Sequence, residues 1–305
     1  PVLECIHFLR EEEPLQSILP KPEVWRGVSH PYLYQAEAVL EDGEGNSLDR
    51  MGIYLPLRQV EYRNRDGKEE ILLNGEVLER KMVRYALPQK GNPVGRQQLI
   101  VEDLRQLRKL GANCILLETS PWQAENGCSG GDGDSLEGRL GIFRQICDRL
   151  GFLVITAGSD KGGFEDTAID ARRAEQGQDS DIPVFRGIQQ SFFLPGRQSP
   201  TPLYYFYRAK WSREPFVYLV PESLKQLSDA NYRVMCYSNC SKVALYTDGR
   251  LFEFKTGERT FLFDEIPCKK PTVMLTAEGD GCIHSLSIHK SFTKSSPNDD
   301  IFPLE

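Results

Sequence analysis

Two stretches near the middle of the chain share one pattern, in which an amphipathic helix is followed by a glycine and a short apolar strand. In the first stretch, leucines at helical spacing form one apolar face, and Gly111 comes directly after the last of them. Residues 113–117 are then mostly apolar, which predicts a buried strand. The leucines of this predicted helix are Leu99, Leu104, Leu107 and Leu110.

The second stretch has the same order of features between residues 135 and 155. Ser135 is suited to cap the helix N-terminus, and Gly151 is placed to end the helix in the left-handed conformation. Residues 152–155 predict the next buried strand. The apolar stripe of this helix consists of Leu136, Leu140, Phe143, Ile146 and Leu150. Because these strands lack polar alternation, the two units together predict a parallel sheet covered by helices.

The sequence on both sides of this region favours antiparallel strands. Residues 1–60 contain strand-like runs, but at this length they supply only part of a seven-stranded sandwich. A hairpin is predicted around Asp66-Gly67 and Asn74-Gly75, which are both favourable turn dipeptides. Further turn signals occur in the C-terminal third of the chain; they are Ser238-Asn239, Asp248-Gly249 and residues 279–281. They predict short strands of a second antiparallel sandwich.

We therefore expect a multidomain protein of the α/β plus all-β class. The expected parts are a partial sandwich (1–60), a shortened α/β domain (61–200), a C-terminal β-sandwich (201–291) and a tail (292–305).

The run ILLNGEVLERK, followed by VEDLRQLRKLGANCILLETSPW, resembles the start of the catalytic barrel of family 2 glycoside hydrolases, the β-galactosidase and β-glucuronidase group. RLGIFRQICDRLGFLVIT resembles the next unit of that barrel. PVFRGIQQSFF and PTPLYYFYRAKWS resemble its last strand and the exit into a C-terminal sandwich. The resemblance implies a TIM-barrel-like core flanked by immunoglobulin-like β-sandwich material. It also places Trp25 and Tyr32 in the core of the sandwich before the barrel.

The barrel-like part is too short to be complete. Eight strand–helix units take about 250 residues, whereas this part runs from about residue 80 to residue 196. Only about thirty residues separate the third strand from the candidate last strand, which is the length of a single βαβ unit. We therefore expect a truncated barrel that lacks about four strands.

The resemblance implies that this truncation removes the catalytic machinery. Retaining glycosidases use two carboxyl groups about 5–5.5 Å apart, and the family carries them as glutamates after its fourth and seventh strands, the first within an Asn-Glu pair. This chain has no Asn-Glu dipeptide. Glu118 and Pro121 replace the family's arginine and histidine, and Ser191 takes the place of its sugar-stacking tryptophan. The chain is thus expected to be a catalytically inactive relative that acts as a carbohydrate-binding or scaffold module.

Two alternatives remain open. The chain could be an active glycosidase whose site is rebuilt or completed by a partner chain, and Glu118, Asp160 and Glu165 are the candidate acids for it. It could equally be an internally deleted form of an ordinary hydrolase. Trp122, Phe192 and Phe193 are the sugar-binding candidates, since flat aromatic faces pack on sugar rings; the alternative for them is packing in the core.

The net charge and the cysteine content limit which partners and binding sites we expect. A net charge of −7 argues against nucleic acid as a partner, and no apolar run is long enough for a membrane span. The chain starts at Pro1 within strand-like sequence, so no signal peptide is expected and the compartment stays open. No cofactor or metal site is predicted, and the eight cysteines are expected to be mainly buried free thiols. Open sheet edges make a homo-oligomer a further expectation.

Overall fold

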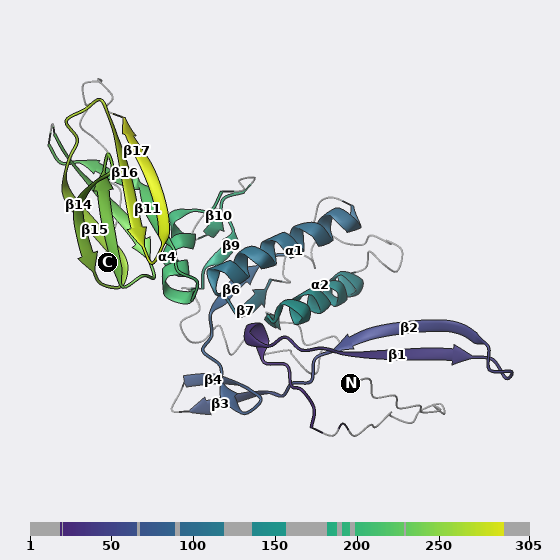
Figure 1. The fold of residues 1–305 in the computed structure, drawn as a ribbon. Helices are drawn as coiled ribbons and strands as arrows, with labels where there is room; N and C mark the ends of the chain where they lie inside the picture. Colours follow the sequence, from purple (N-terminus) through teal and green to yellow (C-terminus); the bar gives the residue numbers. More distant parts are fainter. Residues whose placement is uncertain are drawn as a thin grey trace. The chain divides into compact units, whose positions relative to one another are not determined.

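The computed structural model describes residues 19, 21–65, 68–88, 92–118, 136–156, 182–187, 191–195, 199–228 and 230–289. It is mostly β-structure, with few helices and several sheets (Figure 1). Contacts divide the chain into two units, which we describe separately. One comprises Pro1–Met82, Ala86–Leu104 and Asn113–Ser180; the other comprises Val83–Tyr85, Arg105–Ala112 and Asp181–Glu305. No helix in the described ranges is long and apolar enough to cross a membrane.

The described part of the α/β region carries five short strands. They are β6 (Met82–Tyr85), β7 (Cys114–Leu117), β8 (Leu153–Thr156), β9 (Val184–Arg186) and β10 (Ser191–Phe193), hydrogen-bonded in the order β10-β9-β6-β7-β8. The recorded pairs β9–β10, β6–β9 and β7–β8 are all parallel, as the apolar strand pattern predicts. Closure of this sheet into a barrel is not seen among the described residues.

Helices α1 (Pro93–Leu110) and α2 (Leu136–Leu150) end where the sequence predicts. Gly111 and Gly151 follow them with φ values of 91° and 87°. The amide of Ala112 donates to Leu107 and that of Phe152 to Cys147, the bond of a Schellman cap in each case. The predicted apolar face of α1 is wrong at one position, because Leu99 is 44% exposed and Ile100 takes its place in the core at 6%.

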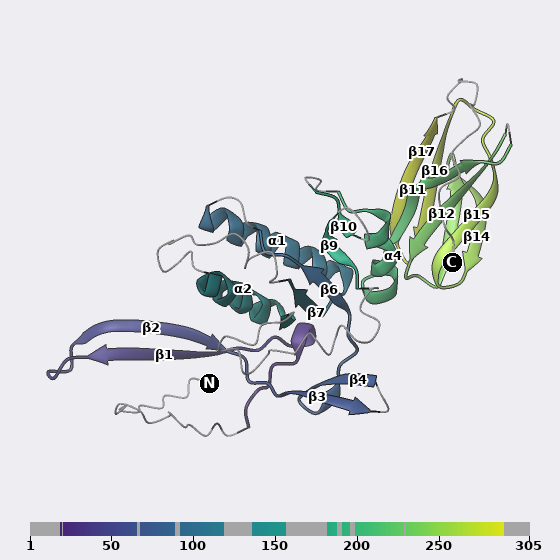
Figure 2. The same cartoon turned by 180° about the vertical axis from the view of Figure 1, so that it is seen from behind.

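The first unit also contains antiparallel pairs before the α/β region. Strands β1 (Tyr34–Glu41) and β2 (Ser47–Leu55) form a two-stranded ribbon (Figure 2). Strands β3 (Val60–Arg65), β4 (Lys68–Leu73) and β5 (Glu76–Val77) form a small sheet. Asn74 and Gly75 connect β4 to β5 with positive φ, as the turn dipeptide predicts. The dipeptide Asp66-Gly67 lies outside the described residues.

Trp25 does not occupy the sandwich core that the resemblance implies for it. Its indole Nε1 donates to the carbonyl of Asp148 at 2.9 Å, in the last turn of α2, and the ring is fully buried. The nearby 3-10 turn η1 (Gly27–Ser29) contacts α2 as well. Tyr32, the other residue of that prediction, is half-buried between the rings of His30 and Tyr34.

The second unit contains helix α4 (Pro202–Trp211) and a two-sheet sandwich (Figure 1). The first sheet has the order β11-β12-β15, and the second has the order β14-β13-β16-β17. The strands are β11 (Val217–Gln226), β12 (Asn231–Ser238), β13 (Lys242–Thr247), β14 (Arg250–Thr256), β15 (Arg259–Pro267), β16 (Thr272–Gly279) and β17 (Cys282–His289).

Alternation of buried and more exposed residues, most regular in β12, builds the sandwich core. In β12 every second residue is buried, and Val234, Leu245, Phe263 and Leu275 from four strands meet in one apolar cluster. The predicted turns are confirmed at Asp248-Gly249 and Asp280-Gly281, which all have positive φ. Residues of the expected tail lie outside the described ranges.

Candidate functional site

The carboxyl ends of the parallel strands are where an α/β sheet of this kind positions reactive groups. Glu118 directly follows β7 and is half-buried there. Asn113 fixes the start of the same strand, because its Oδ1 accepts from the amide of Lys81 and its Nδ2 donates to the carbonyl of Glu79, both at 2.8 Å. Glu118 is thus held at the end of a fully buried strand that is anchored by a side-chain amide.

The other candidate acids, Asp160 and Glu165, lie outside the described residues, and so does the sugar-binding candidate Trp122. Of the three acids, the structure therefore places Glu118 alone. A pocket of about 30 Å³ lies beside the start of α1, where Arg139 donates to the carbonyl of Pro88. A cavity of that volume has room for about two water molecules, whereas small-molecule sites usually measure about 300–1,000 Å³.

Phe192 and Phe193 are core residues, with exposed fractions of 0% and 3%. The ring of Phe192 lies 5.5 Å from that of Tyr207, and the ring of Phe193 lies 5.0 Å from that of Phe185 and 5.8 Å from that of Tyr204. Neither phenylalanine presents a free face, so the prediction that they stack on a sugar is wrong in this structure. The alternative weighed from the sequence, packing in the core, describes both rings.

Ser191, at the position of the family's stacking tryptophan, is also part of the scaffold. Its hydroxyl donates to the carbonyl of Gly187 at 2.7 Å, and its own carbonyl accepts from Thr201 Oγ1 at 2.8 Å. Ser191 is buried. Ser191 therefore connects to the loop after β9 through its hydroxyl and to the residue before α4 through its backbone carbonyl. An aromatic side chain at this position would lose the bond that the hydroxyl makes.

Three of the described thiols are buried and poorly suited to act as nucleophiles. Burial raises the pKa of Cys114 and of Cys236 to about 12, and it raises that of Cys147 well above its usual value. All six described cysteines are free. No group of three or more metal-binding side chains occurs among the described residues. His284 and His289 have separate partners, the amide of Leu219 and Thr272 Oγ1.

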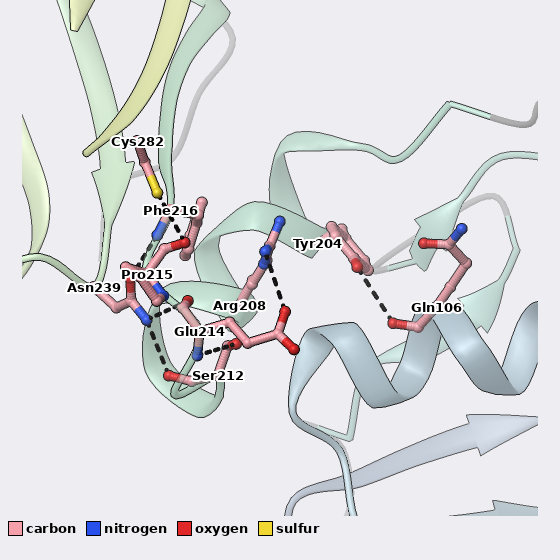
Figure 3. Close-up of polar contacts among 9 residues, drawn as sticks. All are labelled: Gln106, Tyr204, Arg208, Ser212, Glu214, Pro215, Phe216, Asn239 and Cys282. Carbon is pink, nitrogen blue, oxygen red and sulfur yellow. Dashed lines mark hydrogen bonds and ion pairs between the residues drawn. The ribbon is translucent and has the colours of Figure 1, made fainter. Parts of the chain in front are cut away.

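Asn239 has a structural role that the sequence did not reveal beyond its turn preference. Its Oδ1 accepts from the amide of Phe216, and its Nδ2 donates to the carbonyls of Ser212 and Glu214 (Figure 3). One side chain thus satisfies three backbone groups of the segment between α4 and β11. The sequence signals only that Asn239 favours a turn. It does not indicate the partners of the side chain, because they lie more than twenty residues earlier in the chain.

Comparison with known proteins shows similarity at the level of the fold. No family model matches the chain, and no curated protein matches it. An FMN-binding β-glucuronidase from Facaelibacterium prausnitzii L2-6 superposes with a TM-score of 0.65 at 16% identity, over 91% of this chain and 65% of that one. A β-glycosidase from Bacteroides vulgatus gives a TM-score of 0.55 at 13% identity, over 89% and 57% of the two chains.

A family 2 glycosyl hydrolase from Bacteroides cellulosilyticus DSM 14838 matches with a TM-score of 0.51 and 12% identity, covering 89% of this chain and 53% of that chain. The chain therefore has a glycoside-hydrolase-like fold, similar to that of family 2 β-glucuronidases and β-glycosidases. It spans between about half and two thirds of the length of these enzymes.

Proposed function

We propose that this chain is a catalytically inactive member of the family 2 glycoside hydrolase group that binds carbohydrate. One observation carries the proposal: the described part of the parallel region has five short strands, where a complete barrel has eight. The resemblance assigns the two catalytic glutamates to strands that this region has no length to contain. We interpret the region as a truncated barrel, and the absence of any Asn-Glu dipeptide supports this interpretation.

Glu118 favours a second candidate, an active glycosidase with a rebuilt or partner-completed site. It is a half-buried carboxyl group at the carboxyl end of a parallel strand, and the similar structures are hydrolases. Such an enzyme would need a second acid, either about 5–5.5 Å away for retention or about 6.5–9.5 Å away for inversion. Asp160 and Glu165 are the candidates for that second acid.

A hydrolysis assay separates the two proposals. Purified protein is incubated with nitrophenyl β-galactoside, β-glucuronide and β-mannoside, beside the variants Glu118→Gln and Glu102→Gln. Glu102 is an exposed carboxylate on α1 and serves as the matched control. We expect no turnover above buffer for any of the three proteins. Turnover in the native chain and in the Glu102 variant, lost in the Glu118 variant, would establish the rebuilt site and overturn the proposed inactivity.

A binding assay tests whether the chain binds carbohydrate. The chain is applied to an immobilised glycan panel, and hits are measured by calorimetry for the native chain and for Trp122→Ala. We expect weak binding that this substitution reduces at least tenfold, because an aromatic face supplies most of the contact with a sugar ring. Binding to no glycan would contradict a carbohydrate-binding role and leave a scaffold as the remaining role of an inactive chain.

A further inference from the structure

Two cysteines from distant parts of the sequence lie at the same end of the C-terminal sandwich. Cys240 belongs to the turn between β12 and β13 and is buried, while Cys282 is the first residue of β17 and is half-buried. Their thiols donate to consecutive carbonyl groups. Cys282 Sγ donates to the oxygen of Pro215 (Figure 3), at a distance of 3.2 Å. Cys240 Sγ lies 3.7 Å from the oxygen of Phe216.

Gly279 explains why the two cysteines can approach each other. It is the register partner of Cys282 across the β16–β17 hairpin, so a side chain at either position would project from the same face. A Cβ added to Gly279 would lie 3.1 Å from Cys240 Cβ and 3.2 Å from Cys240 Sγ. The side of Gly279 that faces Cys240 therefore carries hydrogen atoms alone.

The position of Gly279 sets an upper limit on the distance between the β-carbons of Cys240 and Cys282. Cβ positions of cross-strand partners are about 4.5–5.5 Å apart, so the β-carbons of Cys240 and Cys282 lie at most about 9 Å apart. A disulfide requires about 3.5–4.5 Å. Cys240 lies in a turn, where a backbone shift costs less than it does within a strand. Burial raises the pKa of the Cys240 thiol, and the nearby Asp280 and Cys282 add to the rise.

Cys236 is the competing partner for Cys240, because the sequence places it only four residues away. It is an inward-facing residue in the middle of β12 and is fully buried in the sandwich core. A bond from Cys240 to Cys236 would have to displace two fully buried core side chains, whereas a bond to Cys282 displaces one, that of Cys240. Cys282 is partly open to solvent and therefore reachable by a small reagent.

We propose that Cys240 and Cys282 form a dithiol that a small disulfide, such as glutathione disulfide, oxidises to an intramolecular disulfide. The thiolate of Cys282 attacks one sulfur of the reagent and releases the first glutathione as a thiol. The thiolate of Cys240 then displaces the second glutathione from the mixed disulfide. One reagent disulfide is reduced to two thiols, and these two thiols receive the protons that the cysteines lose.

Oxidation would change the junction between α4 and the sandwich. The carbonyl of Pro215 loses its bond from Cys282, while that of Phe216 keeps its bond from Ser238 Oγ at 2.7 Å. The new bond would join the turn before β13 to the start of β17, and the cross-link would restrict the unfolded chain. We therefore expect the oxidised protein to melt several degrees higher than the reduced protein.

The test exposes the full chain to glutathione buffers of increasing oxidised-to-reduced ratio, followed by acid quenching and non-reducing peptide mapping. We expect one cross-linked peptide pair containing Cys240 and Cys282, reversal by dithiothreitol, and a melting temperature that rises with the cross-linked fraction. Cys240→Ser and Cys282→Ser should each abolish the cross-link and the shift. Cys236→Ser, the matched control, should keep both.

Three results would overturn the proposal. They are a bond between Cys236 and Cys240, a glutathione adduct on Cys282 that never resolves, and thiols that stay reduced under all buffers. The same peptide map identifies any bond made by Cys5 or Cys128, so a cross-link elsewhere in the chain cannot be mistaken for this one. Serine is close in size to cysteine, and the reduced-state melting temperature of each variant shows whether it folds.

Discussion

At the residue scale, the first unit depends on a buried ion pair that joins two distant segments. Arg58 Nη1 lies 2.6 Å from Asp148 Oδ1, and the two side chains are 8% and 9% exposed. The Arg58 guanidinium also lies 4.4 Å from the centre of the Trp25 ring. Each group satisfies the other in a place that excludes water, so neither tolerates the loss of its partner.

Replacing Arg58 with methionine should strongly destabilise the protein. The substitution leaves the Asp148 carboxylate buried without its counter-ion, and the expected loss is about 3–5 kcal/mol of unfolding free energy. Urea denaturation followed by circular dichroism measures it. Arg50→Met is the matched control, because the Arg50–Glu37 pair is exposed and should contribute less than about 1 kcal/mol. Equal effects of the two substitutions would show that burial of the Arg58 pair has no special role.

His284 predicts a pH dependence of stability. Burial lowers its pKa below the usual value of 6.5, and its Nδ1 accepts from the amide of Leu219 at 3.2 Å, which requires the neutral ring. The unfolded chain therefore takes up a proton at a higher pH than the folded chain. The stabilisation is complete above about pH 6.5 and is lost as the pH falls below it.

Unfolding free energies measured by urea titration between pH 7.5 and pH 5 test this prediction. The native chain should lose stability as the pH falls, by at most about 1.4 kcal/mol per pH unit for this single proton. His284→Gln should flatten that part of the profile, while His289→Gln, at an exposed position, should leave it unchanged. An unaltered slope in the His284 variant would assign the dependence to other groups.

At the element scale, the ends of α1 and α2 are points of close backbone approach. A Cβ at Gly151 would lie 2.6 Å from the carbonyl carbon and oxygen of Gly27, and one at Gly111 would lie 2.5 Å from the same atoms of Trp211. Positive φ and close packing therefore require glycine at both positions. The sequence reveals the requirement for positive φ, because glycine is a common helix-ending signal. The requirement for close packing arises only when a distant segment packs against the helix end.

Gly151→Ala should destabilise the protein by about 2 kcal/mol or more, because the added methyl group meets backbone atoms and the residue has positive φ. Gly141→Ala, inside α2, is the matched control, since nothing lies within 4 Å of the added Cβ. That change should stabilise the helix by about 0.5–1 kcal/mol. Thermal and urea unfolding of both variants measure the difference. A Gly151 variant as stable as the native chain would contradict the close approach.

At the scale of the whole molecule, the β1–β2 ribbon has one apolar face that the described residues leave open. Leu40 and Met51 on that face are 61% and 63% exposed, and Ile53 and Leu55 follow at 40% and 41%. The opposite face carries the Glu37–Arg50 ion pair. A two-stranded ribbon is only marginally stable alone in water, so a covering layer is expected.

The homo-oligomer that the sequence predicts stays a prediction, and this apolar face is the surface at which we test it. Strands of this length present roughly 260 Å² on one face, well below the about 800 Å² per partner of stable complexes. Sedimentation velocity over a range of concentrations should show reversible self-association, reduced by Leu40→Lys and Met51→Lys. Val39→Lys, on the polar face, is the control. A monomer at all concentrations, or equal effects of all three variants, would contradict self-association through this face.

The sequence alone determined the features that depend on local conformation. The helix ends at Gly111 and Gly151 and the turns at Asn74-Gly75 and Asp248-Gly249 were predictable, because positive φ strongly favours glycine and asparagine or aspartate. The buried strands after both helices followed from uninterrupted apolar runs. The predicted face of α1 failed at Leu99, since neighbouring apolar positions on a helix differ in burial only through what packs against them.

Only the tertiary structure decided which residues meet across the chain. It packed Trp25 against α2, buried Phe192 and Phe193 beneath other aromatic rings, and brought Gly279, the cross-strand partner of Cys282, beside Cys240. Glu118 was predictable as a strand-end acid, but its possible partners depend on chain segments far away. Such contacts join residues separated by tens of positions, and the hydrophobic pattern encodes which face is buried without encoding its partner.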